Sequence, residues 1–275
     1  VTYPHFTGLG GDAFMIVADA TGQVRTLSGI GQAAARLPDY HGSIPMRGPG
    51  SMLTTAATVD TWGQAHAISR AECGGTMDWG ALLEPAIRLA RDGFPITPSQ
   101  RFWLDFRADE MDALPGVAAR FLRDGQVPAD GTTIRQPDLA ASLESIAEHG
   151  HRDFYEGRLA ARIAAGLAAA GSPLTADDLA ATAARVEEPL RMAYRGGELL
   201  SHRPPTQGIT TLEIMGILER FDLAAVAEGS ADHYHLLVEA VKLAFIDRNR
   251  HLADPDFCDV PIDRLLSAGH LSGSA

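Results

Sequence analysis

The most prominent run of potentially reactive sequence is the glycine-rich stretch at residues 8–12, Gly-Leu-Gly-Gly-Asp. Such runs can cradle phosphates when they follow a strand and open a helix, or when they end in Lys-Ser/Thr. This run lacks that ending, and it precedes a predicted strand. We therefore interpret it as a tight turn with close backbone packing, which suits glycine because it tolerates positive φ.

Two close pairs of histidines are the next candidates, because imidazoles are common metal ligands. The pairs are His149 with His151 and His233 with His235. Neither has the i, i+4 spacing with a carboxylate that holds zinc on one helical face. We interpret these histidines as surface or core-edge residues, and the sequence predicts no metal site and no cofactor.

The cysteines and serines are candidates for a nucleophile motif. Cys73 and Cys258 lie far apart without CxxC or Cys/His ligand spacing, so neither a zinc knuckle nor a redox motif is present. One long-range disulfide stays open as an alternative. Ser51 follows Gly50 but precedes Met52, so no Gly-x-Ser-x-Gly elbow is encoded. These residues alone name no nucleophile and no base.

A cluster of charged residues near the end of the last predicted helix is the remaining candidate. It consists of Asp247, Arg248, Arg250, Asp254 and Asp256. Mixed charges of this kind are typical of a solvated ion-pair network. A catalytic pair of carboxylates is the alternative interpretation.

The elements that would position these groups are a hairpin and a series of helices. An apolar run at 13–18, a turn at 20–22 and a second strand at 23–28 predict a β-hairpin, followed by a glycine-loosened loop at 29–31. Apolar residues at helical spacing predict helices over 54–70, 78–93, 137–150, 158–170, 209–220 and 230–251. Because Pro85 falls inside the second, that helix either begins after Asp78 or bends.

Two shorter patterns complete the expected elements. Thr175 and Asp178 have the spacing of a capping box at the start of a short helix. The stretch at 190–202 alternates polar and apolar residues around Gly196 and Gly197, which predicts two strands joined by a turn. The helices over 209–220 and 230–251 are expected to complete the chain.

Length, composition and charge limit the class of protein. The chain has 275 residues, of which 45% are hydrophobic and 21% charged, as is typical of a globular protein. It shows no internal repeat and no low-complexity linker, so we expect one domain over 1–275. The formal net charge of −12 repels phosphate backbones and anionic headgroups, which argues against nucleic-acid and membrane partners. No apolar run approaches the roughly 18 residues of a membrane-spanning helix.

The first residues bear on targeting and on where the natural chain begins. They carry neither the basic end nor the apolar stretch of a signal peptide. Because Val1 is not methionine, we expect the natural chain to begin earlier. The sequence leaves a cytoplasmic and a periplasmic location equally open.

Several separated segments, in the same order along the chain, together resemble the large-subunit portion of the γ-glutamyltranspeptidase family. The match runs from Val1 to about Pro261 and rests on segments 8–15, 84–94, 153–157, 194–196, 204–209, 247–248 and 252–257. Its order and coverage make it specific, although no single motif would suffice.

The resemblance implies an α+β fold, the αββα sandwich of the N-terminal-nucleophile hydrolases. Members are made as one precursor that cuts itself into a large and a small subunit. Their nucleophile is a threonine at the new N-terminus of the small subunit, with its own α-amine as base. The resemblance therefore implies that 1–275 is the large-subunit fragment of a heterodimer, holds no catalytic residue, and is inactive without its partner chain.

One substrate contact of the large subunit can be compared residue by residue. In typical γ-glutamyl enzymes an arginine after the glycine-rich hairpin grips the substrate α-carboxylate. Matching without gaps from Phe14 places Ile30 at that position. Arg25 lies five residues earlier, so strand alternation turns it to the opposite face. The resemblance thus implies a pocket wall of Ser28, Gly29 and Ile30 that does not favour glutathione.

The start of the chain, at residues 3–8, and Asp12 resemble the oxamate amidohydrolase branch of the family. This branch implies a small-molecule amide as substrate. A true γ-glutamyltransferase or glutathione hydrolase and a class IV cephalosporin acylase stay open as alternatives. An alternative of another class is a non-catalytic scaffold or binding protein, because a fold does not fix a function.

Overall fold

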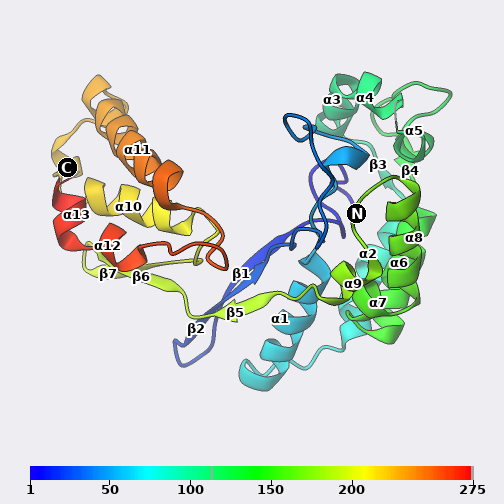
Figure 1. Ribbon diagram of the computed structural model, residues 1–275, viewed down its shortest axis with the longest axis horizontal. Coiled ribbons are helices and arrows are strands. Elements are labelled where there is room, and N and C mark those ends of the chain that lie inside the picture. The colour runs from blue at the N-terminus through cyan, green and yellow to red at the C-terminus, as the bar shows by residue number, and fades with distance from the viewer. Residues whose placement is uncertain (113, 274–275) are drawn as a thin grey trace. The chain divides into compact units, whose positions relative to one another are not determined.

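The computed structural model describes residues 1–112 and 114–273, and its chain divides into two compact units (Figure 1). The first unit comprises Val1–Phe14 and Gly29–Ala184, and the second comprises Met15–Ser28 and Arg185–Ala275. The division into two compact units does not test the expectation of a single domain over 1–275, which stays a prediction. Each unit has hydrophobic clusters of its own.

The first unit is mainly helical. Its helices and strands are α1 (Thr58–Glu72), α2 (Trp79–Asp92), β3 (Phe94–Pro95), α3 (Pro98–Phe106), α4 (Ala108–Asp112), α5 (Pro115–Phe121), β4 (Thr133–Ile134), α6 (Pro137–His149), α7 (Asp153–Glu156), α8 (Arg158–Ala169) and α9 (Ala176–Ala180). In Figure 1, α6, α7 and α8 lie close together with α2. Leu83 and Ile87 of α2 pack there with Leu143 and Ile146 of α6, as their i, i+4 and i, i+3 spacings predict.

The predicted boundaries in this unit are mostly confirmed. Helix α2 begins at Trp79, just after Asp78, and contains Pro85. Gly93 and Gly150 end α2 and α6 with φ angles of 98° and 86°, which favour glycine. The helix expected from residue 54 begins only at Thr58. The preceding residues instead pair with an extended segment, through the bridge of Thr54 with Ala33.

The predicted β-hairpin is confirmed as β1 (Ala13–Ala18) and β2 (Val24–Gly29). Its turn is held by Asp19, whose Oδ1 accepts hydrogen bonds from the backbone N–H groups of Thr21 and Gln23. Strand β2 also pairs antiparallel with β5 (Arg185–Glu187), which gives a three-stranded sheet of order β1-β2-β5. In that register Ser28 lies opposite Arg185.

The second unit also contains a second hairpin and a helical layer. The predicted strands around Gly196 and Gly197 are β6 (Leu190–Tyr194) and β7 (Gly197–Ser201). The two long helices are α10 (Gly208–Leu218) and α11 (Ala231–His251), which pack against each other (Figure 1). The expectation that they complete the chain is wrong, because α12 (Ile262–Leu265) and α13 (Ala268–Gly273) follow. Helices this short hold too few residues for a detectable period.

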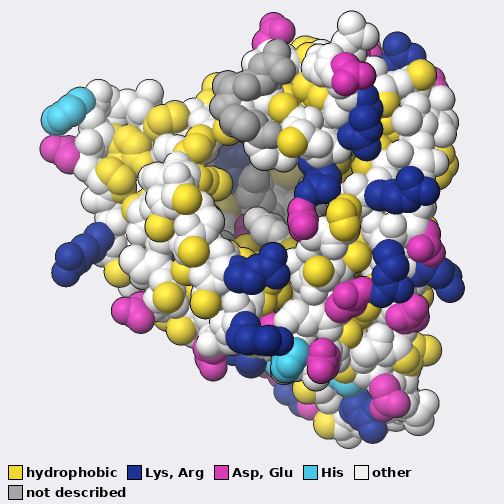
Figure 2. Space-filling model, turned by 90° about the vertical axis from the view of Figure 1, so that its right-hand side faces the viewer, with side chains coloured by type: hydrophobic (Ala, Val, Ile, Leu, Met, Phe, Trp, Pro, Cys, Tyr) yellow, Lys and Arg dark blue, Asp and Glu magenta, His cyan; other side chains and the backbone are white. Residues whose placement is uncertain are grey.

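Basic and acidic side chains are interspersed on the face of the molecule that Figure 2 shows. Cys73 and Cys258 are free and exposed, so the alternative of a disulfide between them is not observed. Within residues 1–112 and 114–273, no helix has both the length and the apolar character needed to cross a bilayer.

Candidate functional site

The predicted pocket wall, Ser28, Gly29 and Ile30, lies where β2 ends. The glycines on either side of Ile30 are packed tightly. A Cβ atom on Gly29 would lie 1.9 Å from Oγ1 of Thr61, and one on Gly31 would lie 1.6 Å from the carbonyl oxygen of Thr55. Real Cβ atoms do not approach other atoms so closely, so neither position can take a side chain without movement of its neighbour. The glycines therefore allow close packing, and the expected loosened loop is a fixed segment.

Hydrogen bonds hold the backbone that follows Ile30. Gly31 N–H donates to Oδ1 of Asp12 at 3.1 Å, and Gln32 N–H donates to Oγ1 of Thr55 at 3.1 Å. Thr55 N–H in turn donates to the Gln32 carbonyl at 2.9 Å. The path of the chain on the C-terminal side of Ile30 is thus set by neighbours in the same unit.

The glycine-rich run at 8–12 positions α1. The carbonyl oxygen of Gly11 accepts from both the N–H and the Oγ1 of Thr58, at 3.1 and 2.7 Å, at the first residue of that helix. Positive φ is absent at Gly8, Gly10 and Gly11, so that part of the interpretation is wrong. The run ends at Asp12, the acceptor for Gly31, and it therefore has a structural role.

Ile30 presents a half-buried aliphatic side chain at the position where the family arginine was expected. Its carbonyl oxygen accepts from Nε2 of Gln32 at 2.9 Å. An aliphatic side chain offers no donor to a carboxylate. Position 30 can therefore contribute only shape and hydrophobic contact.

Ser28 is buried in the second unit, beside a histidine that the sequence analysis did not single out. Its Oγ lies 3.2 Å from Nδ1 of His202. Burial lowers the pKa of His202, which favours the neutral imidazole. The Nδ1 atom of a neutral imidazole can accept a hydrogen bond from the Ser28 hydroxyl or, in the other tautomer, donate one to the hydroxyl oxygen. His202 lies between β7 and the segment at 204–209, but no sequence spacing marks it as a partner of Ser28, which lies 174 positions away.

A cavity of about 570 Å³ lies against the glycine-rich run in the first unit. Asp12 and Thr58, both already placed by the contacts above, contribute to its lining together with Leu9, Trp62 and Gln136. Apolar side chains with a few polar groups are the usual composition of a small-molecule pocket.

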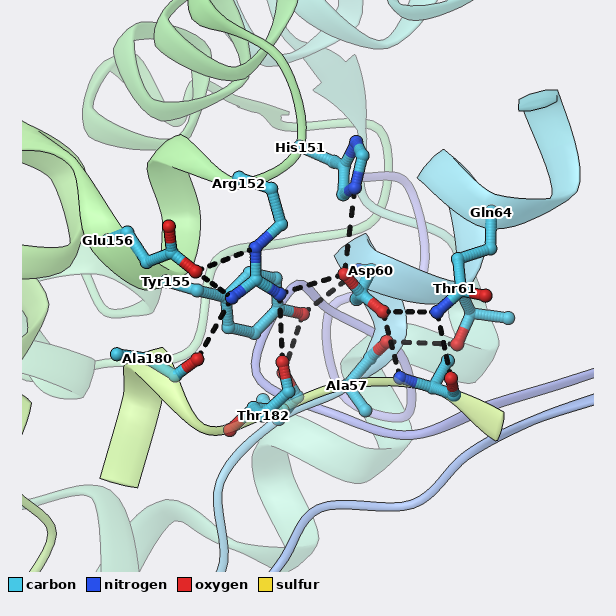
Figure 3. A network of polar contacts seen from close by, with 12 residues as sticks. Ala57, Asp60, Thr61, Gln64, His151, Arg152, Tyr155, Glu156, Ala180 and Thr182 are labelled. Carbon is cyan, nitrogen blue, oxygen red and sulfur yellow. Dashed lines mark hydrogen bonds and ion pairs between the residues drawn. The ribbon is translucent and has the colours of Figure 1, made fainter. Parts of the chain in front are cut away.

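A buried ion-pair network lies at the start of α1 (Figure 3). Its centre is Asp60, which is 2% exposed. Oδ1 lies 2.9 Å from Nη1 of Arg152, and Oδ2 accepts from Ala184 N–H and from Nε2 of Gln64, both at 2.8 Å. Burial raises the pKa of Asp60, but these hydrogen bonds and the Arg152 charge outweigh it, so that the pKa lies below its usual value.

Arg152 extends the network to the chain that leads into β5. It donates to the carbonyl oxygens of Thr182 at 2.8 Å and Ala180 at 3.0 Å, and it pairs with Glu156. Its guanidinium also lies 4.8 Å from the ring centroid of Tyr155. Each Asp60 oxygen thus has a donor, so the network is suited to holding elements together and not to proton transfer.

The two histidines of the first predicted pair contact different groups in the structure. His149 Nδ1 lies 3.1 Å from the Ser145 carbonyl, whereas Nε2 of His151 lies 3.6 Å from Oδ1 of Asp60. His233 and His235 lie on α11, where His233 Nδ1 accepts from Gly229 N–H. These positions fit the interpretation as surface or core-edge histidines.

The residues of the predicted charged cluster also lie in different surroundings. Asp256 forms an exposed ion pair with Arg185, and Nη1 of Arg248 donates to Oε1 of Gln207 at 3.0 Å. Asp247 differs, because its side chain is largely buried and lies 2.8 Å from Nε2 of His270. The interpretation as a solvated network therefore holds for Asp256 and is wrong for Asp247.

Several curated proteins that resemble the chain are named as proenzymes. It is 40% identical over 271 residues to the oxamate amidohydrolase proenzyme of Klebsiella pneumoniae, a match that covers 97% of this chain and 51% of that protein. It is 34% identical over 282 residues to the glutathione hydrolase proenzyme of Escherichia coli, covering 100% of this chain and 48% of that protein. The chain thus spans about half the length of these curated relatives.

Solved structures give the same result for the fold. The chain is similar to the γ-glutamyltranspeptidase of Helicobacter pylori, with a TM-score of 0.87 and 25% identity over 100% of this chain and 80% of that chain. It is also similar to the cephalosporin acylase of Bacillus halodurans, with a TM-score of 0.90 and 29% identity over 100% of this chain and 52% of that chain. The predicted α+β fold of the N-terminal-nucleophile hydrolases is thereby confirmed.

The family model that matches the chain is described as gamma-glutamyltranspeptidase, and it matches residues 1–274. This match covers the segments that carried the resemblance, from the glycine-rich run to the region after α11. The chain therefore belongs to the γ-glutamyltranspeptidase family.

Proposed function

We propose that this chain is the large-subunit part of a self-processing threonine amidohydrolase. Two facts support this: the relatives named above are proenzymes, and the chain spans 51% of the Klebsiella pneumoniae protein. The small subunit from the same precursor would supply the nucleophilic threonine. This chain would contribute part of the pocket wall and the surface that receives its partner.

The proposed chemistry is acyl transfer in two steps. The threonine hydroxyl attacks the amide carbonyl, and its proton passes to the threonine α-amine. The C–N bond then breaks as that amine returns the proton to the leaving nitrogen, which leaves an acyl ester on the threonine. Water, or an acceptor amine in a transferase, attacks this ester and releases the acid or the new amide.

The observation that carries the substrate proposal is Ile30 at the end of β2, between two glycines that fix the backbone. A bidentate arginine grip on a carboxylate involves charge-assisted hydrogen bonds worth about 1.5–3 kcal/mol, or more than tenfold in affinity. Without it, hydrolysis of a small amide is favoured over glutathione cleavage. The 40% identity to a protein named oxamate amidohydrolase supports the same choice.

Exposed apolar side chains on the sheet support the proposed partner. Strand β1 lies at one edge of the sheet, where Phe14 and Ile16 are 46% and 48% exposed. Val186, on the opposite edge strand β5, is also exposed. Exposed edge strands with apolar side chains are expected to pair with another chain.

The test uses the full-length precursor, purified after maturation. Two polypeptides are expected, and N-terminal sequencing of the second should begin with threonine. Hydrolysis of oxamate should be faster than release of p-nitroaniline from γ-glutamyl-p-nitroanilide. Efficient γ-glutamyl release would contradict the Ile30 argument, and a second chain that does not begin with threonine would favour the scaffold alternative.

An acylase acting on a larger amide is the second candidate. It is supported by the TM-score of 0.90 to the Bacillus halodurans cephalosporin acylase and by 38% identity to an acylase proenzyme from Pseudomonas over 71% of this chain. A cephalosporin assayed beside oxamate separates the two candidates.

A further inference from the structure

Three ionisable side chains that are far apart in sequence meet inside the second unit. They are Glu213 from α10, Asp247 from α11 and His270 from α13. One potential ligand atom from each lies within 4.8 Å of the others. Glu213 is 2% exposed, and the side chains of Asp247 and His270 are 14% and 22% exposed. The cluster is largely screened from solvent, in contrast to the solvated ion-pair network expected around Asp247.

Glu213 is the unusual member of this cluster. Both of its carboxylate oxygens are buried, and neither has a hydrogen-bond partner among the residues that the structure describes. A carboxylate without hydrogen bonds is costly to bury. Burial and the neighbouring Asp247 raise the pKa of Glu213 to about 8. A bound cation would supply these buried oxygens with the partner that they lack.

We propose that Glu213, Asp247 and His270 bind a divalent transition-metal ion such as Zn²⁺. Around a tetrahedral Zn²⁺, ligand atoms at about 2.0–2.2 Å from the ion lie about 3.3–3.6 Å apart. Nε2 of His270 lies 2.8 Å from Oδ2 of Asp247 and 4.0 Å from Oε1 of Glu213, so the two separations lie on either side of that value. The ion would replace the hydrogen bond between His270 and Asp247 and would draw Glu213 closer. Two carboxylates and one imidazole are ligands that zinc accepts.

The two carboxylates of the cluster face one nearby guanidinium, that of Arg264. Nε2 of His251 lies 3.8 Å from Oδ1 of Asp247, and Nη2 of Arg264 lies 2.8 Å from that same His251 nitrogen. Arg264 lowers the pKa of Glu213, so its charge offsets only part of the effect of burial and Asp247. A divalent ion would neutralise both carboxylates and would tie α13 to α10 and α11. We expect a structural site.

The test is zinc binding by the full-length protein after dialysis against EDTA. Titration calorimetry should show one Zn²⁺ bound per chain, and zinc should raise the melting temperature. Glu213→Gln and His270→Gln should each weaken binding at least about tenfold. His235→Gln, which changes an exposed histidine on the same helix α11, should leave binding unchanged. Circular dichroism checks that every variant is folded.

Three results would overturn the proposal. One is no saturable zinc binding by the unmodified protein, and another is binding that survives both cluster substitutions. The third combines two observations: Glu213→Gln melts at a higher temperature than the unmodified protein, and zinc does not change the melting temperature of the unmodified protein. Together they would identify Glu213 as a neutral acid. Since none of these measurements uses turnover, failure of the metal proposal is distinguishable from failure of the proposed amidohydrolase activity.

Discussion

At the residue scale, the proposed substrate preference depends on a single side chain. Ile30 stands between Gly29 and Gly31, where an added Cβ atom would clash with Thr61 and Thr55, and Gly31 N–H is held by Asp12. An arginine at this position would therefore start from the same backbone. Its guanidinium would supply the planar fork that fits a carboxylate.

Ile30→Arg is accordingly expected to shift the mature enzyme toward γ-glutamyl substrates. We expect kcat/KM for γ-glutamyl-p-nitroanilide to rise by about tenfold or more, the equivalent of one charge-assisted contact. Ile44→Arg, in an exposed loop, is the matched control and should change nothing. Equal rates for the two variants would show that position 30 does not face the acyl group.

The glycine at 31 gives a second prediction at this scale. Gly31→Ala places a methyl group on the Thr55 carbonyl and should cost about 1–3 kcal/mol of unfolding free energy, as overpacking does. Gly10→Ala has no atom within 4 Å of the new Cβ and should be nearly neutral. Thermal melting of the mature protein compares them. Equal melting temperatures would mean that the segment gives way easily.

At the element scale, the Asp60–Arg152 pair joins α1 to the residue before α7 and to the chain at 180–184. Sequence patterns identified the long helices, because several turns of apolar spacing define a period, and they identified the hairpin through alternation. They did not predict α3, α4 or α5, which have between five and nine residues. The ion pair joins residues 92 positions apart, and no local pattern encodes that.

Asp60→Asn should destabilise the protein by about 1–3 kcal/mol, because it removes the buried carboxylate charge that accepts from Ala184 N–H and pairs with Arg152, which keeps Glu156 as a partner. The pKa of Asp60 is lower in the folded state, so its contribution is complete above the unfolded value of 3.8 and is lost as the pH falls through the folded value. Denaturation of both proteins between about pH 7 and 2.5 measures the difference. A difference that does not shrink in acid would contradict this assignment. Asp130→Asn, in an exposed turn, is the control.

At the scale of the whole molecule, the family and its fold class followed from several segments taken in order, and the match over residues 1–274 confirmed them. The candidate metal cluster could not be predicted in this way. Its members come from three helices, and the last of them, α13, has only six residues. The charged sequence neighbours of Asp247 predict a solvated network, whereas its side chain is largely buried beside Glu213 and His270. Sequence order therefore suffices for the family, and tertiary contacts are needed for the cluster.

The chain expressed without its proposed partner should self-associate. The exposed side chain of Ile16 on the edge strand β1 would then face solvent. Light scattering should show particles larger than a 29.2 kDa monomer, whereas the matured complex should give one defined mass. Ile16→Lys should reduce the association. A stable monomer of the unmodified chain would count against the missing subunit.

The two tightly packed glycines beside Ile30 have an evolutionary consequence. Because they fix the course of the chain, replacing residue 30 alters the group that is displayed and leaves the scaffold around it in place. A single codon change at this position can then be selected for a new preference without compensating mutations elsewhere. Divergent specificities within one lineage could arise by this route.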